Sequence, residues 1–184
     1  MLPPAEWVIL RQQGSVAPPY MRHIIAILLQ NEAGALARVA GLFSTRGYNI
    51  ESLSVAPTDD PTVSRVTLVT KGSDSVIQQI VNQLHKLIDV VRVEDMTLGE
   101  HLERELVLVK LAVSPQDTDA LRGCIVRAGG RVLDPAPDGF IAELTASEAE
   151  VNAFIREAGS RGRLLEVVRS GALGIARGRP ADGT

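Results

Sequence analysis

Hydrophobic residues recur with two alternating periods along the chain from residue 21 onward. Short apolar runs rich in β-branched residues predict strands at 23–29, 49–55, 64–70 and 90–95. Between these runs, apolar residues return at helical spacing and predict two helices, the first through Leu36, Val39, Ala40 and Phe43 and the second through Ile77, Ile80, Val81, Leu84 and Ile88. The first half of the chain is therefore predicted to fold in the order βαββαβ.

The second half repeats the same alternation. Strands are predicted at 105–113, 131–135, 139–144 and 164–169, with helices near 121–128 and 151–158, and residues 171–177 trailing after the last strand. Two units of roughly 75 residues fit the size of this motif. We therefore predict an α+β protein with two tandem ferredoxin-like βαββαβ domains, at 21–98 and 99–178. Residues 1–20, which contain four prolines, are predicted to be a flexible extension, and residues 179–184 a disordered tail.

The first strand is apolar on both of its faces. Ile24, Ala26 and Leu28 alternate with Ile25, Ile27 and Leu29, and only one set can face the two helices of its own unit. An exposed apolar sheet face of this kind is typical of an interface. We expect a partner subunit or the other half of the chain to cover it.

Composition excludes several classes of function. Lys plus Arg numbers 19 against 22 for Asp plus Glu, which argues against a dedicated nucleic-acid binder. The strands predicted at 64–70 and 105–113 contain no aromatic side chain on which RNA bases could stack. No apolar run approaches the roughly 20 residues that span a bilayer, and residues before Met21 lack a secretory signal. We expect a cytoplasmic protein that binds neither nucleic acid nor membrane.

Potential catalytic or metal-binding side chains are few and scattered. The single cysteine, Cys124, lies on the apolar face of a predicted helix, where core packing is favoured over nucleophilic chemistry. His23, His85 and His101 show no ligand spacing and are interpreted as surface residues, and Asp59 with Asp60 lies in a proline-flanked turn. We predict no catalytic residue and no metal site.

One loop stands out, at residues 31–36 between the first strand and the first helix. A helix N-terminus offers unpaired N–H groups and the positive end of the helix dipole, both of which suit a carboxylate. Gly34 has no Cβ and would allow a ligand to approach the backbone. The local pattern is equally consistent with a purely structural role, in which Asn31 or Glu32 starts the helix and Gly34 relieves a tight turn.

Residues 31–60 closely resemble the ACT domain of the small, regulatory subunits of acetohydroxyacid synthase (acetolactate synthase). The string Arg-Gly-Tyr-Asn-Ile-Glu-Ser-Leu at 46–53, followed by Ala-Pro-Thr-Asp at 56–59, is specific to that family rather than to ACT domains at large. The resemblance resumes at Glu-Arg-Glu-Leu-Val-Leu-Val-Lys, 103–110, and covers about 21–178, although 114–165 match more loosely.

The resemblance implies a non-catalytic subunit that acts in branched-chain amino-acid biosynthesis. Family members bind a large, thiamine-diphosphate-dependent subunit, raise its activity and make it sensitive to feedback inhibition by valine. Thiamine diphosphate, Mg and FAD are expected in that catalytic subunit and no cofactor in this chain. A homodimer through the ACT domain is expected to bind valine between its two copies. The matching effector residues are Asn31, Ala33, Gly34, Ala35 and Leu36 from one copy, and Asn49 and Ile50 from the other.

The chemistry of these residue types agrees with such a ligand. The effector carboxylate would lie on the N–H groups near Gly34–Leu36, its ammonium would meet Asn31, Asn49 and carbonyl oxygens, and its side chain would meet Leu36 and Ile50. A methylene group changes affinity by only about 1–3 kcal/mol, so valine is expected and leucine or isoleucine stays open. Two alternatives also remain: a stand-alone ACT sensor for another enzyme, and an acylphosphatase-like enzyme, which Glu32 in the loop disfavours.

Overall fold

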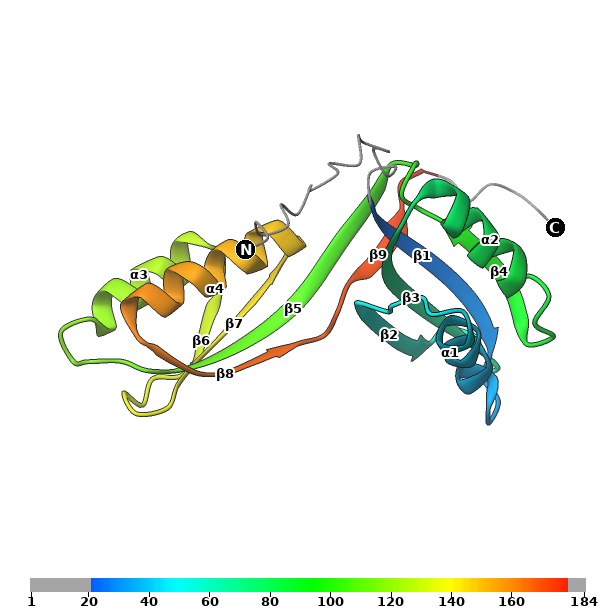
Figure 1. Ribbon diagram of the computed structural model, residues 1–184. Coiled ribbons are helices and arrows are strands. Elements are labelled where there is room, and N and C mark those ends of the chain that lie inside the picture. Colours follow the sequence, from blue (N-terminus) through cyan, green and yellow to red (C-terminus); the bar gives the residue numbers. More distant parts are fainter. Residues whose placement is uncertain (1–20, 179–184) are drawn as a thin grey trace, which may run out of the picture.

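The computed structural model describes residues 21–178, so the predicted extension at 1–20 and tail at 179–184 lie outside the described residues. The described chain contains two antiparallel sheets, each with two helices, which confirms the predicted α+β class with two ferredoxin-like units. The two units form separate lobes that a long two-stranded ribbon connects (Figure 1). The predicted boundary between 98 and 99 stays a prediction.

The first lobe, which we call the N-terminal unit, has the sheet order β2-β3-β1-β4. All neighbouring strands are antiparallel. Its elements are β1 (Met21–Gln30), α1 (Ala35–Thr45), β2 (Ser52–Pro57), β3 (Val63–Gly72), α2 (Asp74–Leu84) and β4 (Val90–Asp95).

The second lobe, the C-terminal unit, has the order β6-β7-β5-β8, and β9 pairs with the first residues of β5. Its elements are β5 (His101–Ala112), α3 (Thr118–Arg127), β6 (Arg131–Asp134), β7 (Phe140–Ala146), α4 (Glu148–Arg161), β8 (Arg163–Arg169) and β9 (Leu173–Ala176). The helix α4 begins with a full capping box, because Ser147 and Glu150 satisfy each other's backbone N–H groups.

Each unit has its own apolar core between its sheet and its helices. In the N-terminal unit, Ile25, Ile27 and Leu29 alternate inward from β1 and meet Val39 and Phe43 of α1. In the C-terminal unit, alternate residues of β5 pack in the same way against α3 and α4, and Cys124 lies in this core. Period-two burial on the strands and period-3.6 burial on the helices explain why the sequence pattern predicted both units.

The second face of the first sheet is partly covered by the C-terminal part of the chain. Ile24 and Ala26 form a small buried cluster with Val69, Met96 and Ala172. Gly174 of β9 lies so close that a Cβ there would overlap the end of the Met96 side chain. The expected cover therefore comes from the other half of the chain, and residues 171–177, which were predicted to trail, instead contain a strand.

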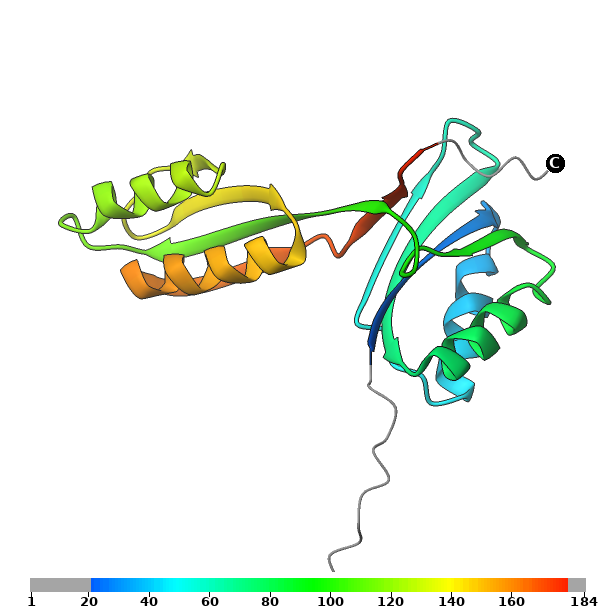
Figure 2. The same ribbon diagram turned by 90° about the horizontal axis from the view of Figure 1, so that it is seen from above.

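That strand completes the ribbon between the lobes. Residues His101–Arg104 of β5 pair with β9, and Val107–Ala112 of the same strand pair with β8. Gly171, at φ +76°, lies between β8 and β9 and allows the chain to change direction there. Figure 2 shows the ribbon as the link between the two lobes.

Three further predictions were wrong in detail. The second helix ends at Leu84, and Ile88, predicted on its apolar stripe, is 88% exposed. The strand β2 begins at Ser52 rather than Asn49, so Asn49 and Ile50 lie in a loop. His23, predicted on the surface, is buried beside α2 with its ring nitrogens 3.7 and 3.6 Å from carboxylates of Asp74 and Asp95.

Candidate functional site

The helix α1 begins at an open N-terminus. Gly34 is its N-cap residue, with φ +88° and ψ −13°, and no side chain caps the helix there. The Arg38 N–H donates to the Gly34 carbonyl at 3.0 Å as the first helical hydrogen bond. Within residues 21–178, the N–H groups of Leu36 and Ala37 have no acceptor, and both residues are exposed. The left-handed φ of the turn is by itself a sufficient reason for glycine at this position. The same geometry leaves N–H groups and the positive end of the helix dipole available to an anion.

Asn31 joins this loop to the turn between β2 and β3. Its backbone N–H donates to the Thr62 carbonyl at 2.7 Å, and its Nδ2 donates to the Pro61 carbonyl at 2.9 Å. Asp60 accepts hydrogen bonds from the Thr62 hydroxyl and N–H, which lower the pKa of the Asp60 carboxyl. The NH2 group of the Asn31 side chain therefore helps to position the loop. Its Oδ1 could accept a hydrogen bond from an ammonium group.

A half-buried ion pair between Arg38 and Asp89, which the sequence did not indicate, lies beside the loop. Asp89 is only 4% exposed, and Arg38 Nη2 donates to its Oδ1 at 2.8 Å. This hydrogen bond lowers the pKa of Asp89 and raises the pKa of Arg38. A Cβ on Gly34 would come within 3.1 Å of Arg38 Nη1, so the guanidinium lies directly beside the helix N-terminus. No local motif marks two residues that are 51 positions apart.

The seven predicted effector residues do not meet within one chain. Asn31, Ala33, Gly34, Ala35 and Leu36 lie before or at the start of α1, whereas Asn49 and Ile50 follow its end. The remaining nine residues of α1, at 37–45, separate the two groups, which at 1.5 Å per residue is about 14 Å. Ala35 is buried and the other four residues of the first group are exposed.

The loop that holds Asn49 and Ile50 is well anchored. The Thr70 hydroxyl donates to the Asn49 carbonyl at 2.6 Å, and the Glu51 N–H donates to the Val69 carbonyl at 2.8 Å. The side chain of Ile50 packs partly against the first core, and Asn49 is exposed. The second group is therefore presented at the surface by a fixed backbone.

Other candidate side chains show no catalytic arrangement. Cys124 is 1% exposed, and burial raises the pKa of its thiol, which disfavours the reactive thiolate. Residues 21–178 contain no group of three or more His, Cys, Asp or Glu side chains placed to hold a metal ion. Over the same residues, no helix has the length and apolar character needed to cross a membrane.

Comparisons with known proteins match most of the described chain. A model for the AHAS small subunit-like ACT domain matches residues 25–92, and a model for the small subunit of acetolactate synthase matches residues 104–178. The acetolactate synthase isozyme 3 small subunit of Escherichia coli is 46% identical over 158 residues, which cover 86% of this chain and 97% of the relative. A probable acetolactate synthase small subunit of Archaeoglobus fulgidus is 41% identical over 162 residues, covering 86% and 98%.

The solved structures give the same result. The crystal structure of an acetolactate synthase small subunit from Thermotoga maritima superposes with a TM-score of 0.79 at 30% identity, covering 87% of this chain and 99% of that one. Identity at this level over nearly the full length of several relatives exceeds what a shared fold alone would give. The chain therefore belongs to the family of acetolactate synthase small subunits.

Proposed function

We propose that this protein is the regulatory subunit of an acetolactate synthase. It binds a thiamine-diphosphate-dependent catalytic large subunit, raises its activity and makes it sensitive to feedback inhibition by valine in branched-chain amino-acid biosynthesis. Membership of the acetolactate synthase small-subunit family supports binding to a catalytic large subunit. The open N-terminus of α1 at Gly34 is the observation that supports an amino-acid effector.

In this proposal the chain itself is not an enzyme and carries no cofactor. Thiamine diphosphate, Mg and FAD belong to the large subunit, and both subunits work in the cytoplasm. The small subunit then acts only through binding, by a coupling free energy of about 1–3 kcal/mol between its effector site and the catalytic partner.

Valine fits the surroundings of Gly34. Its carboxylate lies over the free N–H groups of Leu36 and Ala37, and the Arg38 guanidinium adds positive charge nearby even while paired with Asp89. Its ammonium meets the Oδ1 of Asn31 on the same loop. Leu36, which is 36% exposed, supplies apolar surface for the isopropyl group.

A homodimer through β2 brings the remaining contacts to this site. The edge of β2 away from β3 has no strand partner within residues 21–178. Antiparallel pairing of two β2 strands about a two-fold axis places the Ser52 end of one copy beside the Pro57 end of the other. The Asn31 loop lies at the Pro57 end, because Asn31 bonds Pro61 and Thr62 in the turn that follows β2. Asn49 and Ile50 lie at the other end, just before Ser52. Pairing through β4 instead would leave Asn49 far from the second loop.

An acetolactate assay of the large subunit, with and without this chain and across a valine titration, tests the proposal. We expect the chain to raise the activity and valine to lower it again, while valine has no such effect on the large subunit alone. Failure to co-purify with or activate any thiamine-diphosphate enzyme would favour a stand-alone sensor. Hydrolysis of an acyl phosphate by the purified chain would favour the acylphosphatase alternative, which the pairing of Arg38 with Asp89 disfavours.

A further inference from the structure

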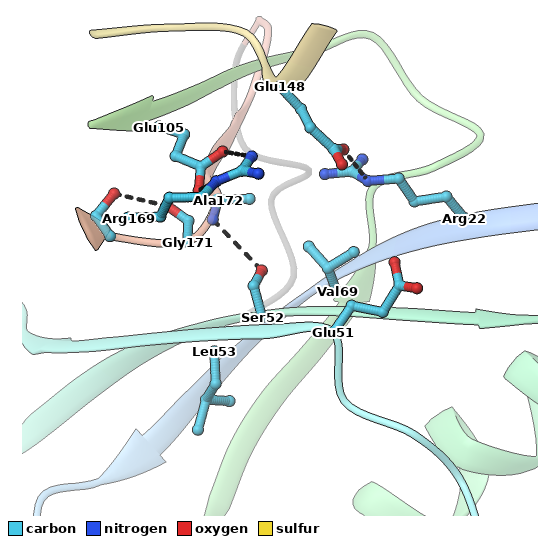
Figure 3. A pocket seen from close by; sticks show the side chains of 11 residues that line it. Arg22, Glu51, Ser52, Leu53, Val69, Glu105, Glu148, Arg169, Gly171 and Ala172 are labelled. Carbon is cyan, nitrogen blue, oxygen red and sulfur yellow. Dashed lines mark hydrogen bonds and ion pairs between the residues drawn. The ribbon is translucent and has the colours of Figure 1, made fainter. Parts of the chain in front are cut away.

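Besides the apolar cluster around Ala172 and a hydrogen bond from Arg65 to the Gly174 carbonyl, the two units meet at a set of polar contacts. We call this set the interunit joint: Arg22, Ser52, Glu103, Glu148 and Ala172. Figure 3 shows Arg22 reaching from β1 toward Glu148 at the start of α4, and Ser52 bonded to the segment before β9. Around them lies a cavity of about 340 Å³ whose walls come from both units. The contacts differ from the cores of the units in being polar and ionic.

Arg22 is the central side chain of the joint. Its Nη1 donates to Glu103 Oε2 at 3.0 Å, and its Nε lies 2.6 Å from Glu148 Oε2. The side chain of Arg22 is 28% exposed and that of Glu103 15%, whereas that of Glu148 is 39% exposed. Partly buried, shared ion pairs of this kind hold geometry better than isolated surface pairs do. Removing the guanidinium leaves two carboxylates without their counter-charge between the units.

Ser52 provides the second contact, at the first residue of β2. Its hydroxyl accepts the Ala172 N–H at 3.4 Å. Gly171 approaches so closely that a Cβ built on it would lie 3.1 Å from the Ser52 Cβ. The backbone of the C-terminal segment therefore rests directly on Ser52, only two positions after Ile50 of the proposed effector site.

The contact continues from Ala172 into the body of the C-terminal unit. The Ser170 hydroxyl accepts the Leu106 N–H of β5 at 3.0 Å. Arg169 bonds Glu105 of β5 through Nε at 2.8 Å and Asn152 of α4 through Nη1 at 3.0 Å. Both the backbone segment and α4, which also carries Glu148, are thus tied to the same sheet.

We infer that the interunit joint transmits effector binding at Asn49 and Ile50 to the C-terminal unit, an inference that rests on the proposed function. Bonds to Thr70 and Val69 fix the backbone of this loop on β3, so an amino acid bound against Asn49 and Ile50 sets the position of the loop together with that of Ser52. Ser52 contacts Ala172 and Arg22 pairs with Glu148. The position of the loop therefore selects one orientation of the C-terminal unit. Breaking the joint should leave valine binding intact and remove the effect of bound valine on the catalytic partner.

The variant Arg22→Gln tests this, with Arg131→Gln as the matched control. Arg131 forms an ion pair with Glu143 that lies wholly within the C-terminal sheet. Valine affinity is measured by calorimetry on the free small subunit, and valine inhibition is measured on the reconstituted holoenzyme. We expect Arg22→Gln to bind valine within about twofold of wild type, while the valine concentration for half-inhibition rises at least about fivefold, the lower limit of typical allosteric coupling. Arg131→Gln should match wild type in both measurements.

The outcomes separate the two claims. Unchanged inhibition of the Arg22→Gln holoenzyme contradicts the inference and leaves the proposed function standing. Loss of valine binding by the free Arg22→Gln subunit also contradicts it, because Arg22 would then belong to the binding site itself. Absence of valine binding by the wild type contradicts the proposed function instead. If Arg22→Gln does not fold, Glu148→Gln, which removes one of the two ion pairs, is measured in its place with the same expectations.

Discussion

Replacing Gly34 by aspartate places a carboxylate where the effector carboxylate is proposed to lie. The φ of +88° costs a residue with a Cβ about 1 kcal/mol, and aspartate and asparagine tolerate this region better than most. The new Cβ would come within 3.1 Å only of Arg38 Nη1, the end of a flexible side chain that can shift. We therefore expect Gly34→Asp to fold with only a small loss in the free energy of unfolding.

The electrostatic effect on binding is larger than this strain. Two like charges about 4 Å apart repel by about 1 kcal/mol in water and about 4 kcal/mol in a partly buried site. Arg38 partly neutralises the added charge, which favours the lower part of this interval. We expect valine affinity to fall at least about fivefold in Gly34→Asp.

Gly34→Asn is the matched control for this prediction. It carries the same backbone strain and nearly the same volume without the charge. Calorimetry with valine, together with urea denaturation of all three proteins, separates binding from stability. Equal valine affinities for Gly34→Asp and wild type would refute the placement of the carboxylate over α1.

Two further predictions concern stability, each measured by urea denaturation. The pKa of Asp89 is lowered in the folded state, so the Arg38–Asp89 pair stabilises the protein above the ordinary carboxyl pKa, and that contribution is lost as pH falls below about 4. Asp89→Asn should therefore have a lower free energy of unfolding at neutral pH, and this free energy should fall less on acidification than that of wild type. Equal losses of the free energy of unfolding on acidification in the two proteins would contradict this. Phe43→Ala, at a 1% exposed core position, should lower the free energy of unfolding by about 3–5 kcal/mol, whereas Ile88→Ser should change it by less than about 0.5 kcal/mol; similar losses in both would contradict the end of α2 at Leu84.

Periodicity predicted the elements because each unit has one apolar core that alternate strand residues and one helix face must fill. It failed where a tertiary contact overrides the local pattern. The spacing continues through Ile88, but Gln30 bonds the Asp89 carbonyl and Asp89 bonds Arg38, so the chain leaves the helix before that point. The β9 strand was missed because it depends on pairing with β5 and on the left-handed Gly171 rather than on its own four residues.

The candidate site also has features that the local sequence predicted and features that depend on tertiary contacts. The loop at 31–36 was visible because a helix N-terminus with glycine is a local feature, and the structure shows that turn with Gly34 in the left-handed region. The burial of Asp89 and its pairing with Arg38 join residues far apart in sequence, and no local pattern carries that information. The joining of Gly34 to Asn49 stays a prediction, since it requires a second copy of the chain.

The claim that an amino acid is held between two copies is tested most directly with a mixed dimer. Gly34→Asp and Asn49→Ala are each expected to weaken valine binding at both sites of their own homodimers, by at least about fivefold in Gly34→Asp. Co-expressed with different tags and purified as a heterodimer, the two variants leave one site with both native halves and one with neither. Calorimetry should then show about one valine per heterodimer, half the capacity of wild type, at near-native affinity. A heterodimer that binds no valine, or homodimers that keep full binding, would contradict a site shared across the two chains.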